Sequence, residues 1–332
     1  MKQKLLAVAV SGALAALAAP ASFAQSTATI SGSINVGIMA TGAEGASGDA
    51  NVASQGGGAN AININTTEDL GGGMKGGFQS QMRFNAATGD RNSAGTGYAL
   101  LHVANAYLQG GFGTVRLGKI GEMHNCGFDA WGCTGGAGMV AGHANSVSAL
   151  IAGGTTANAV HYTTPSFNGV SLSLQTSRST RTNERRLVSI DYARGPITAQ
   201  WLQLNNNANT YGDSGSAPKD EKAKGTSLGA SYDLKFAKLN VINAVTKNAD
   251  GQKTVGVSSL SGSVPMGAYT WLAGYNKSRT GGNYTATSAN DTKFAVGVNY
   301  ALSKRTTLGA DVFNSEVANG STGYNLRIRH TF

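Results

Sequence analysis

The chain has 332 residues and a net charge of +9 at pH 7, and only 13% of its residues are charged. Its mean hydropathy is slightly negative, at −0.15. After residue 24 no apolar run approaches the ~20 residues that a membrane-spanning helix requires, which excludes a helical membrane protein. A secreted β protein or a transmembrane barrel remains, because barrel strands turn only every second residue to lipid.

The N-terminus has the pattern of a secretory signal peptide over residues 1–24. Lys2 and Lys4 form a basic start, residues 5–19 are apolar or small, and small residues stand at positions 22 and 24. Cleavage before Gln25 removes 24 of the 332 residues and two positive charges, which leaves 308 residues with a charge of +7. An uncleaved anchor is the alternative, but the run is short. Residues 25–332 are expected to form a single domain.

The mature chain opens with an apolar residue at every second position, which predicts a β-strand. The apolar face is formed by Ala28, Ile30, Gly32, Ile34, Val36 and Ile38. The residues between them are small or polar. The pattern returns in Met74–Phe84, Val170–Ser177, Thr292–Leu302 and Tyr324–Phe332.

Three features favour a barrel in lipid over a soluble sandwich, which would also alternate. The segments are about ten residues long, as a tilted membrane strand requires. Their polar faces carry Gln, Asn, Lys and Arg, and the chain ends on the aromatic Phe332. Several tyrosines are then candidates for the aromatic girdles at the lipid interfaces; ordinary strand packing is the alternative for each. They are Tyr107, Tyr232, Tyr269, Tyr275, Tyr300 and Tyr324.

Short and long connections alternate along the chain, and their number predicts sixteen antiparallel strands. The short ones lie at 68–73, 110–113, 165–169, 193–196, 233–237, 264–267 and 303–305. The long ones lie at 41–58, 85–97, 121–157, 178–185, 205–225, 248–251, 279–290 and 315–322. Short turns are periplasmic and long loops external in such barrels, so both termini are expected on the periplasmic side.

The segment Gly121–Ala157 is longer than ordinary loops, at about 37 residues, and a function is therefore expected for it. It contains Cys126 and Cys133. An exported chain meets an oxidising compartment, so a disulfide between them is the first interpretation. A metal site with His124 and His143 is the alternative, although the spacing fits no common zinc pattern.

The sequence resembles the general bacterial porins, most closely their β-proteobacterial branch. The matching blocks follow the family's order along the mature chain. They are Thr67–Lys75, Ala106–Leu108, Gly111–Val115, Tyr162–Gly169, Tyr300–Thr306 and Ile328–Phe332.

The resemblance implies a homotrimer of sixteen-stranded barrels, each with its third external loop, here Gly121–Ala157, folded into the lumen as a constriction. It also implies basic wall residues facing acidic residues on that loop. Lys119 stands at a basic family position, whereas His161 replaces an arginine, and Asn65 and Thr66 lie where a basic residue is common. The cysteine pair is outside the family pattern.

Alternation selects the side chains expected in the lumen. The basic candidates are Lys75, Arg83, Arg116, His161, Arg327 and Arg329, with Lys119 added from the resemblance. Glu122 and Asp129 are the acidic candidates on the constriction loop. Solvation near the rims is the alternative for the basic group, and capping of the loop backbone for the acidic pair.

The sequence thus predicts an all-β, 16-stranded antiparallel transmembrane β-barrel in the outer membrane, acting as a general diffusion porin for small hydrophilic solutes and ions. The excess charge suggests a mild anion preference; basic groups on the outer rim could instead bind lipopolysaccharide phosphates. Besides ions and solutes, the expected partners are outer-membrane lipid, lipopolysaccharide and the barrel-assembly machinery, which the resemblance implies reads Phe332. No cofactor, metal or nucleic acid is expected.

Three other functions stay open at this stage. A substrate-specific channel for a sugar or organic anion would show saturable, solute-blocked conductance. An outer-membrane enzyme barrel would need an activated nucleophile with a base in reach, and no such motif stands out. A secreted soluble β protein or adhesin would not partition into the outer membrane.

Overall fold

The computed structural model describes ten stretches of the chain. They are residues 26–40, 50–54, 60–90, 101–121, 125–132, 155–178, 184–206, 224–280, 291–315 and 322–332. Residues 1–24 lie outside them, so the signal peptide stays a prediction.

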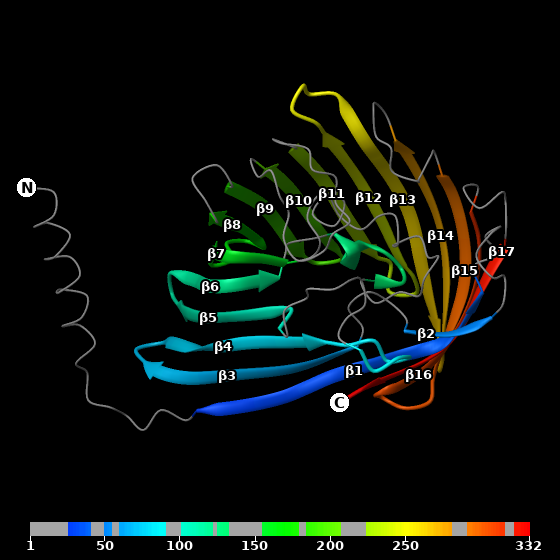
Figure 1. The fold of residues 1–332 in the computed structure, drawn as a ribbon, viewed down its shortest axis with the longest axis horizontal. Helices are drawn as coiled ribbons and strands as arrows, with labels where there is room; N and C mark the ends of the chain where they lie inside the picture. The colour runs from blue at the N-terminus through cyan, green and yellow to red at the C-terminus, as the bar shows by residue number, and fades with distance from the viewer. Residues whose placement is uncertain are drawn as a thin grey trace, which may run out of the picture.

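The described residues form seventeen strand segments in one antiparallel sheet (Figure 1). The first nine are β1 (Thr27–Ala40), β2 (Asn51–Ser54), β3 (Ala61–Gly71), β4 (Met74–Arg83), β5 (Val103–Gly110), β6 (Gly113–Gly121), β7 (Thr155–Thr163), β8 (Val170–Arg178) and β9 (Glu184–Arg194). The others are β10 (Ile197–Asn206), β11 (Lys224–Asp233), β12 (Lys238–Lys247), β13 (Lys253–Met266), β14 (Tyr269–Thr280), β15 (Asp291–Ala301), β16 (Thr306–Ser315) and β17 (Thr322–Thr331).

The seventeen segments form the sixteen strands of the barrel, because β2 and β3 together occupy one strand position beside β1. Both pair with β1: β2 with Val36–Met39 and β3 with Thr27–Ser33. The predicted strand number is therefore confirmed, and the seven predicted short turns fall at strand ends. The prediction of one uninterrupted long connection at 41–58 was wrong, because residues 51–54 pair with the end of β1 and form β2.

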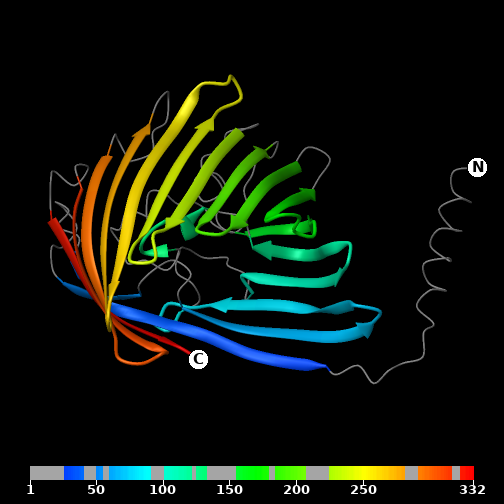
Figure 2. The same cartoon turned by 180° about the vertical axis from the view of Figure 1, so that it is seen from behind.

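The sheet closes between its first and last strands. β1 pairs with β17 from Ser33↔Thr331 to Ala40↔Tyr324, and the two strands lie side by side in both views of the fold (Figures 1 and 2). Beyond the last strand, Phe332 and Gly32 exchange two backbone hydrogen bonds of 3.0 Å. Closure leaves no sheet edge, which is what a backbone in hydrocarbon requires.

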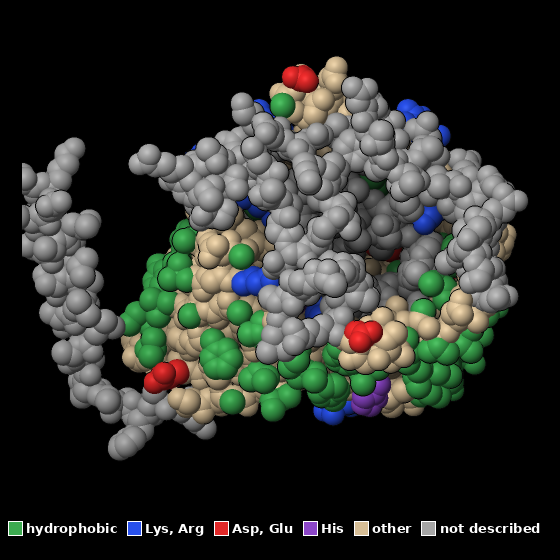
Figure 3. Space-filling model, in the orientation of Figure 1, with side chains coloured by type: hydrophobic (Ala, Val, Ile, Leu, Met, Phe, Trp, Pro, Cys, Tyr) green, Lys and Arg blue, Asp and Glu red, His purple; other side chains and the backbone are tan. Residues whose placement is uncertain are grey.

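The outer face is apolar, as the alternation predicted. Ile30, Ile34 and Ile38 of β1 are 66%, 40% and 45% exposed. Figure 3 shows hydrophobic side chains gathered over the outer strands along the lower part of the molecule. Five of the six tyrosines considered for the lipid interface are among these exposed residues: Tyr232, Tyr269, Tyr275, Tyr300 and Tyr324.

Tyr107 is the exception. Its strand neighbour Leu108 is exposed on the outer face, so Tyr107 faces inward. Its hydroxyl lies 2.8 Å from Oγ1 of Thr67. The alternation of this strand predicts the inward position of Tyr107 when the apolar Leu108 is assigned to the outer face.

The turn between β3 and β4 requires its three successive glycines. Gly71, Gly72 and Gly73 have φ values of +79°, +60° and +77°, a region that side chains with a Cβ rarely adopt. Among the described residues no helix is long and apolar enough to cross a membrane; one short 3-10 turn, η1 (Cys126–Phe128), lies between β6 and β7.

Removing Phe332 is expected to lower the yield of folded protein in the outer membrane, because both hydrogen bonds to Gly32 are lost with the aromatic ring. Semi-native gels of membrane fractions measure the folded, heat-modifiable species. Phe332→Ala is the matched variant, since it keeps the backbone bonds. An unchanged yield after deletion would contradict the prediction, and a yield lowered equally in both variants would assign the effect to the ring.

Candidate pore constriction

One side of the inner wall, on β4 to β7, carries a group of basic side chains. Arg116 is the cross-strand partner of both Tyr107 and His161. Its Nε lies 3.4 Å from the amide oxygen of Gln79, a contact at the long limit of a hydrogen bond. Arg83 donates from Nε to the amide oxygen of Gln81 at 2.7 Å.

His161 is held firmly in this wall. It is 7% exposed, and its ring nitrogens lie 3.1 Å from Oε1 of Gln175 and 2.9 Å from Oγ1 of Thr163. Two neutral partners fix the ring beside Arg116 without adding charge. The histidine that replaces the arginine expected from the resemblance is therefore a hydrogen-bonded wall residue.

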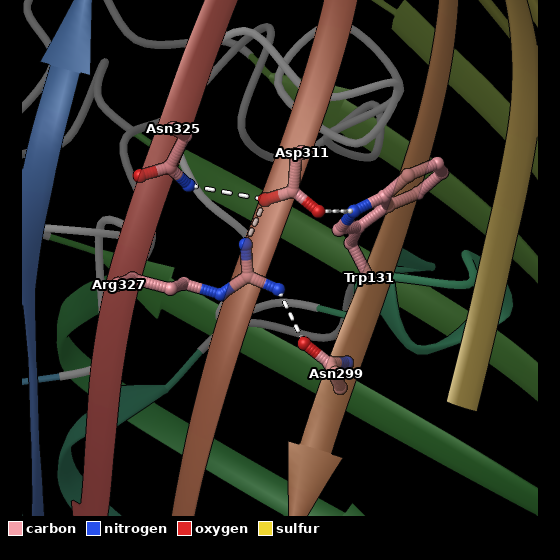
Figure 4. Close-up of polar contacts among 5 residues, drawn as sticks. All are labelled: Trp131, Asn299, Asp311, Asn325 and Arg327. Atoms are coloured by element: carbon pink, nitrogen blue, oxygen red, sulfur yellow. Dashed lines mark hydrogen bonds and ion pairs between the residues drawn. The ribbon is translucent and has the colours of Figure 1, made fainter. Parts of the chain in front are cut away.

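The far side of the inner wall holds Arg327 in a closed polar network (Figure 4). Its guanidinium forms an ion pair with Asp311 and donates to Oδ1 of Asn299 at 2.6 Å. Asn325 donates to the same carboxylate oxygen of Asp311 at 3.1 Å. The side chains of Arg327 and Asp311 are 8% and 0% exposed. Arg327 is therefore neutralised against the wall.

Two glycines make room for this network. A Cβ on Gly309 would collide with the guanidinium of Arg327, and one on Gly297 would collide with the carboxylate of Asp311. The guanidinium can lie flat on the wall only because these positions have no side chain.

The segment 125–132, between β6 and β7, is attached to the inner wall by polar contacts. Asn125 donates to Oγ of Ser227 at 2.9 Å, and the backbone N–H of Ala130 donates to Oγ of Ser261 at 2.9 Å. These partners belong to β11 and β13. The segment therefore runs across the lumen face of the barrel, as the resemblance implied for the constriction loop.

Trp131 attaches the segment to the wall by both a hydrogen bond and apolar packing. Its indole Nε1 donates to Oδ1 of Asp311 at 2.8 Å (Figure 4). The ring is 6% exposed and packs with Leu272, Ala295 and Phe313 of the inner wall. Without the segment, these apolar side chains of the inner wall would face the water of the lumen.

Phe128 makes a second apolar contact, and it again depends on a glycine. A Cβ on Gly229 of β11 would collide with the Phe128 ring. The sequence pattern did not single out Trp131, Phe128 or Asp311 as site residues. For Asp311 a signal existed, since a single carboxylate stands on the inward face of β16.

Asp129 is buried at 4% exposure, and its Oδ1 accepts the backbone N–H of Trp131 at 2.9 Å. It thus caps its own loop, which was the alternative to a role in the constriction. Within the described part of the chain its Oδ2 has no hydrogen-bond partner. Burial raises the pKa of Asp129 to about 6, and the hydrogen bond from Trp131 opposes this shift.

The other predicted site residues are placed less centrally or lie outside the described residues. Lys75 is exposed near a short turn, opposite Asp69, and Arg329 faces inward opposite Asn35. Lys119 sits at a β-bulge between Gly118 and Ile120, which interrupts the alternation there. Glu122 and Cys133 fall outside the description, as does the side chain of Cys126, so the disulfide stays a prediction.

Replacing Trp131 with Phe is expected to loosen the segment from the wall. The ring still packs, but the donor to Asp311 is lost, and an unsatisfied buried acceptor costs about 1–3 kcal/mol. Open-channel current noise and cleavage of the segment by protease should both rise. Trp271→Phe, on the lipid face, is the matched control. Equal noise in both variants would contradict the attachment.

Attachment of the segment is expected to weaken as pH rises through about 6. Because the folded-state pKa of Asp129 lies above the ordinary value of 3.8, the folded protein binds its proton more tightly than the unfolded chain. Stability is therefore full below about pH 4 and falls up to about pH 6, by at most about 3 kcal/mol. Current noise should rise over this window in the native protein and stay flat in Asp129→Asn. The exposed Asp69→Asn is the control, and a similar rise in both variants would contradict the assignment.

Comparison with known proteins agrees with this geometry. The chain is 27% identical over 327 residues to outer membrane porin protein 32 of Delftia acidovorans, covering 93% of this chain and 88% of that protein. Its fold is similar to an anion-selective porin from Comamonas acidovorans, with a TM-score of 0.73 at 20% identity over 93% of this chain and all of the other. It is also similar to OmpT of Vibrio cholerae in its trimer form, with a TM-score of 0.68 at 12% identity over 92% of this chain and 99% of the other. The family model for Gram-negative porins matches residues 7–319, so the chain belongs to the Gram-negative porin family and is an outer-membrane diffusion channel.

Proposed function

We propose that this porin is a homotrimer of general diffusion channels with a mild preference for anions. A sixteen-stranded cylinder is too wide for its own side chains to fill, so the lumen stays wet. Solutes pass by diffusion, without a bond being made or broken. Selection then depends on the charges at the narrowest cross-section.

The anion preference is inferred from a difference between two inward-facing arginines in how far their charge is neutralised. Arg327 is paired with Asp311. Within the described part of the chain Arg116 forms no ion pair, and its guanidinium nitrogen meets only the neutral amide of Gln79. Among the described residues no carboxylate therefore cancels the positive charge of Arg116, and this charge attracts anions into the channel.

Two comparisons support the proposal. The structurally similar porin of Comamonas acidovorans is described as anion-selective, and the similar OmpT structure as a trimer. The net charge of +9 on the whole chain has the same sign. Lipopolysaccharide and the barrel-assembly machinery are proposed partners on the strength of the family alone.

Arg116→Gln is expected to lower the chloride-over-potassium permeability ratio, by roughly twofold, because a cation is removed from a narrow water-filled passage with low-dielectric walls. The measurement is the reversal potential of reconstituted protein across a KCl gradient. Three-step closure of the current would support the trimer. Arg186→Gln is the control, since that side chain is exposed and paired with Glu184.

Either of two results would count against the proposal. A cation-selective native channel would mean that groups other than Arg116 govern the passage. Saturable block by one sugar or organic anion would replace general diffusion with a substrate-specific channel.

A further inference from the structure

The lipid-facing surface carries an apolar groove of about 430 Å³ where the barrel closes. It spans β1, β15, β16 and β17. The outward side chains that line it include Ile38, Tyr300, Leu308, Ala310, Leu326 and Ile328. It therefore lies on the opposite side of the sheet from the Arg327 network.

The groove exists because a small residue stands among large ones. Ala310 is the cross-strand partner of Val298 on one side and of Leu326 on the other. The floor includes backbone of Gly37 and Gly309, the glycine that makes room for Arg327 on the inner face. The same glycine thus serves both surfaces of the sheet.

Basic groups stand at the short-turn end of the groove. His330 follows Ile328 on the outward face of β17, about 7 Å further along the strand. Its Nδ1 lies 2.9 Å from Oγ1 of Thr306, its cross-strand partner. The turn that precedes Thr306 exposes Lys304 and Arg305. Basic and histidine side chains are seen at the lower edge of Figure 3, next to hydrophobic ones.

An aromatic pair indicates the depth in the membrane of the short-turn end of the groove. The rings of Tyr300 and Tyr269 lie 4.8 Å apart between centroids, tilted by 36°. Outward tyrosines form girdles at the membrane interface of such barrels. The groove therefore lies at the depth of acyl chains, and the basic groups lie at the depth of headgroups on the periplasmic side, where the short turns are.

We propose that the groove and the basic group of Lys304, Arg305 and His330 form a binding site for one anionic phospholipid of the periplasmic leaflet. An acyl chain fills the groove over Ala310, and the phosphate accepts hydrogen bonds from the basic side chains. The proposal rests on the membrane location of the barrel and is independent of the anion preference of its lumen.

The charges favour a lipid over a second copy of the chain. A protein surface on this groove would bury three basic groups and would have to supply carboxylates for them. A phosphate brings its charge at the required depth with its acyl chains attached.

The test uses the full-length protein in nanodiscs of equal phosphatidylglycerol and phosphatidylcholine, followed by native mass spectrometry of retained lipids. The native protein should retain phosphatidylglycerol over phosphatidylcholine by at least about fivefold. The triple variant K304Q/R305Q/H330Q should lose this preference. The control R194Q/K235Q/K238Q, at other short turns, should keep it.

A second pair of variants tests the groove with its charges intact. Ala310→Leu fills it and should lower retention of phosphatidylglycerol severalfold, whereas Ala273→Leu, on the outward face of β14, should not. Leu is tolerated at both positions because both face lipid. Conductance of the same preparations reports folding and pore function separately.

Three results would overturn the site. The two triple variants could retain phosphatidylglycerol equally, or Ala310→Leu could retain as much as Ala273→Leu. Alternatively, Ala310→Leu could dissociate the oligomer on semi-native gels with lipid retention unchanged, which would make the groove an interface between subunits.

Discussion

The whole structure depends on one requirement: each backbone N–H and C=O within the hydrocarbon must find a partner inside the protein. The antiparallel sheet meets it along every strand, and β1 with β17 meets it at closure. The requirement also fixes the faces. Once each strand is paired on both sides, its side chains must alternate between lipid and lumen, which places Ile38 outside and Arg116 inside.

Inside the barrel a second constraint applies. The lumen is wide and filled with water, so apolar side chains on the inner wall must be covered by another part of the chain. The segment 125–132 covers them, and Asp311 is its central partner. One buried carboxylate receives the indole of Trp131, the amide of Asn325 and the guanidinium of Arg327. Attachment of the segment and neutralisation of Arg327 therefore depend on the same carboxylate, that of Asp311. Arg116 and His161 lie elsewhere on the inner wall, where they are paired across β6 and β7.

Glycines connect the two surfaces of the sheet. Gly309 makes room for the Arg327 side chain inside, and its backbone, beside the small Ala310, forms part of the groove outside. A larger residue at position 309 would displace the guanidinium. The proposed lipid site and the inner network therefore depend on the same short stretch of β16, although they face different solvents.

The sequence alone determined the architecture. The number of sixteen barrel strands, the short turns and the strand positions other than β2 follow from a period of two and from alternating connection lengths, both of which are local. The sequence also placed Arg83, Arg116 and His161 on the inner wall. Only the tertiary structure decided which charges remain uncompensated. Asp311 and Arg327 are sixteen residues apart, and Trp131 lies 180 residues before Asp311. Alternation predicts which face of the sheet a residue occupies. It does not predict the neighbouring side chains, because these depend on strand register and on where a long loop packs. The sequence could not reveal the role of Trp131 or the capping by Asp129 for the same reason.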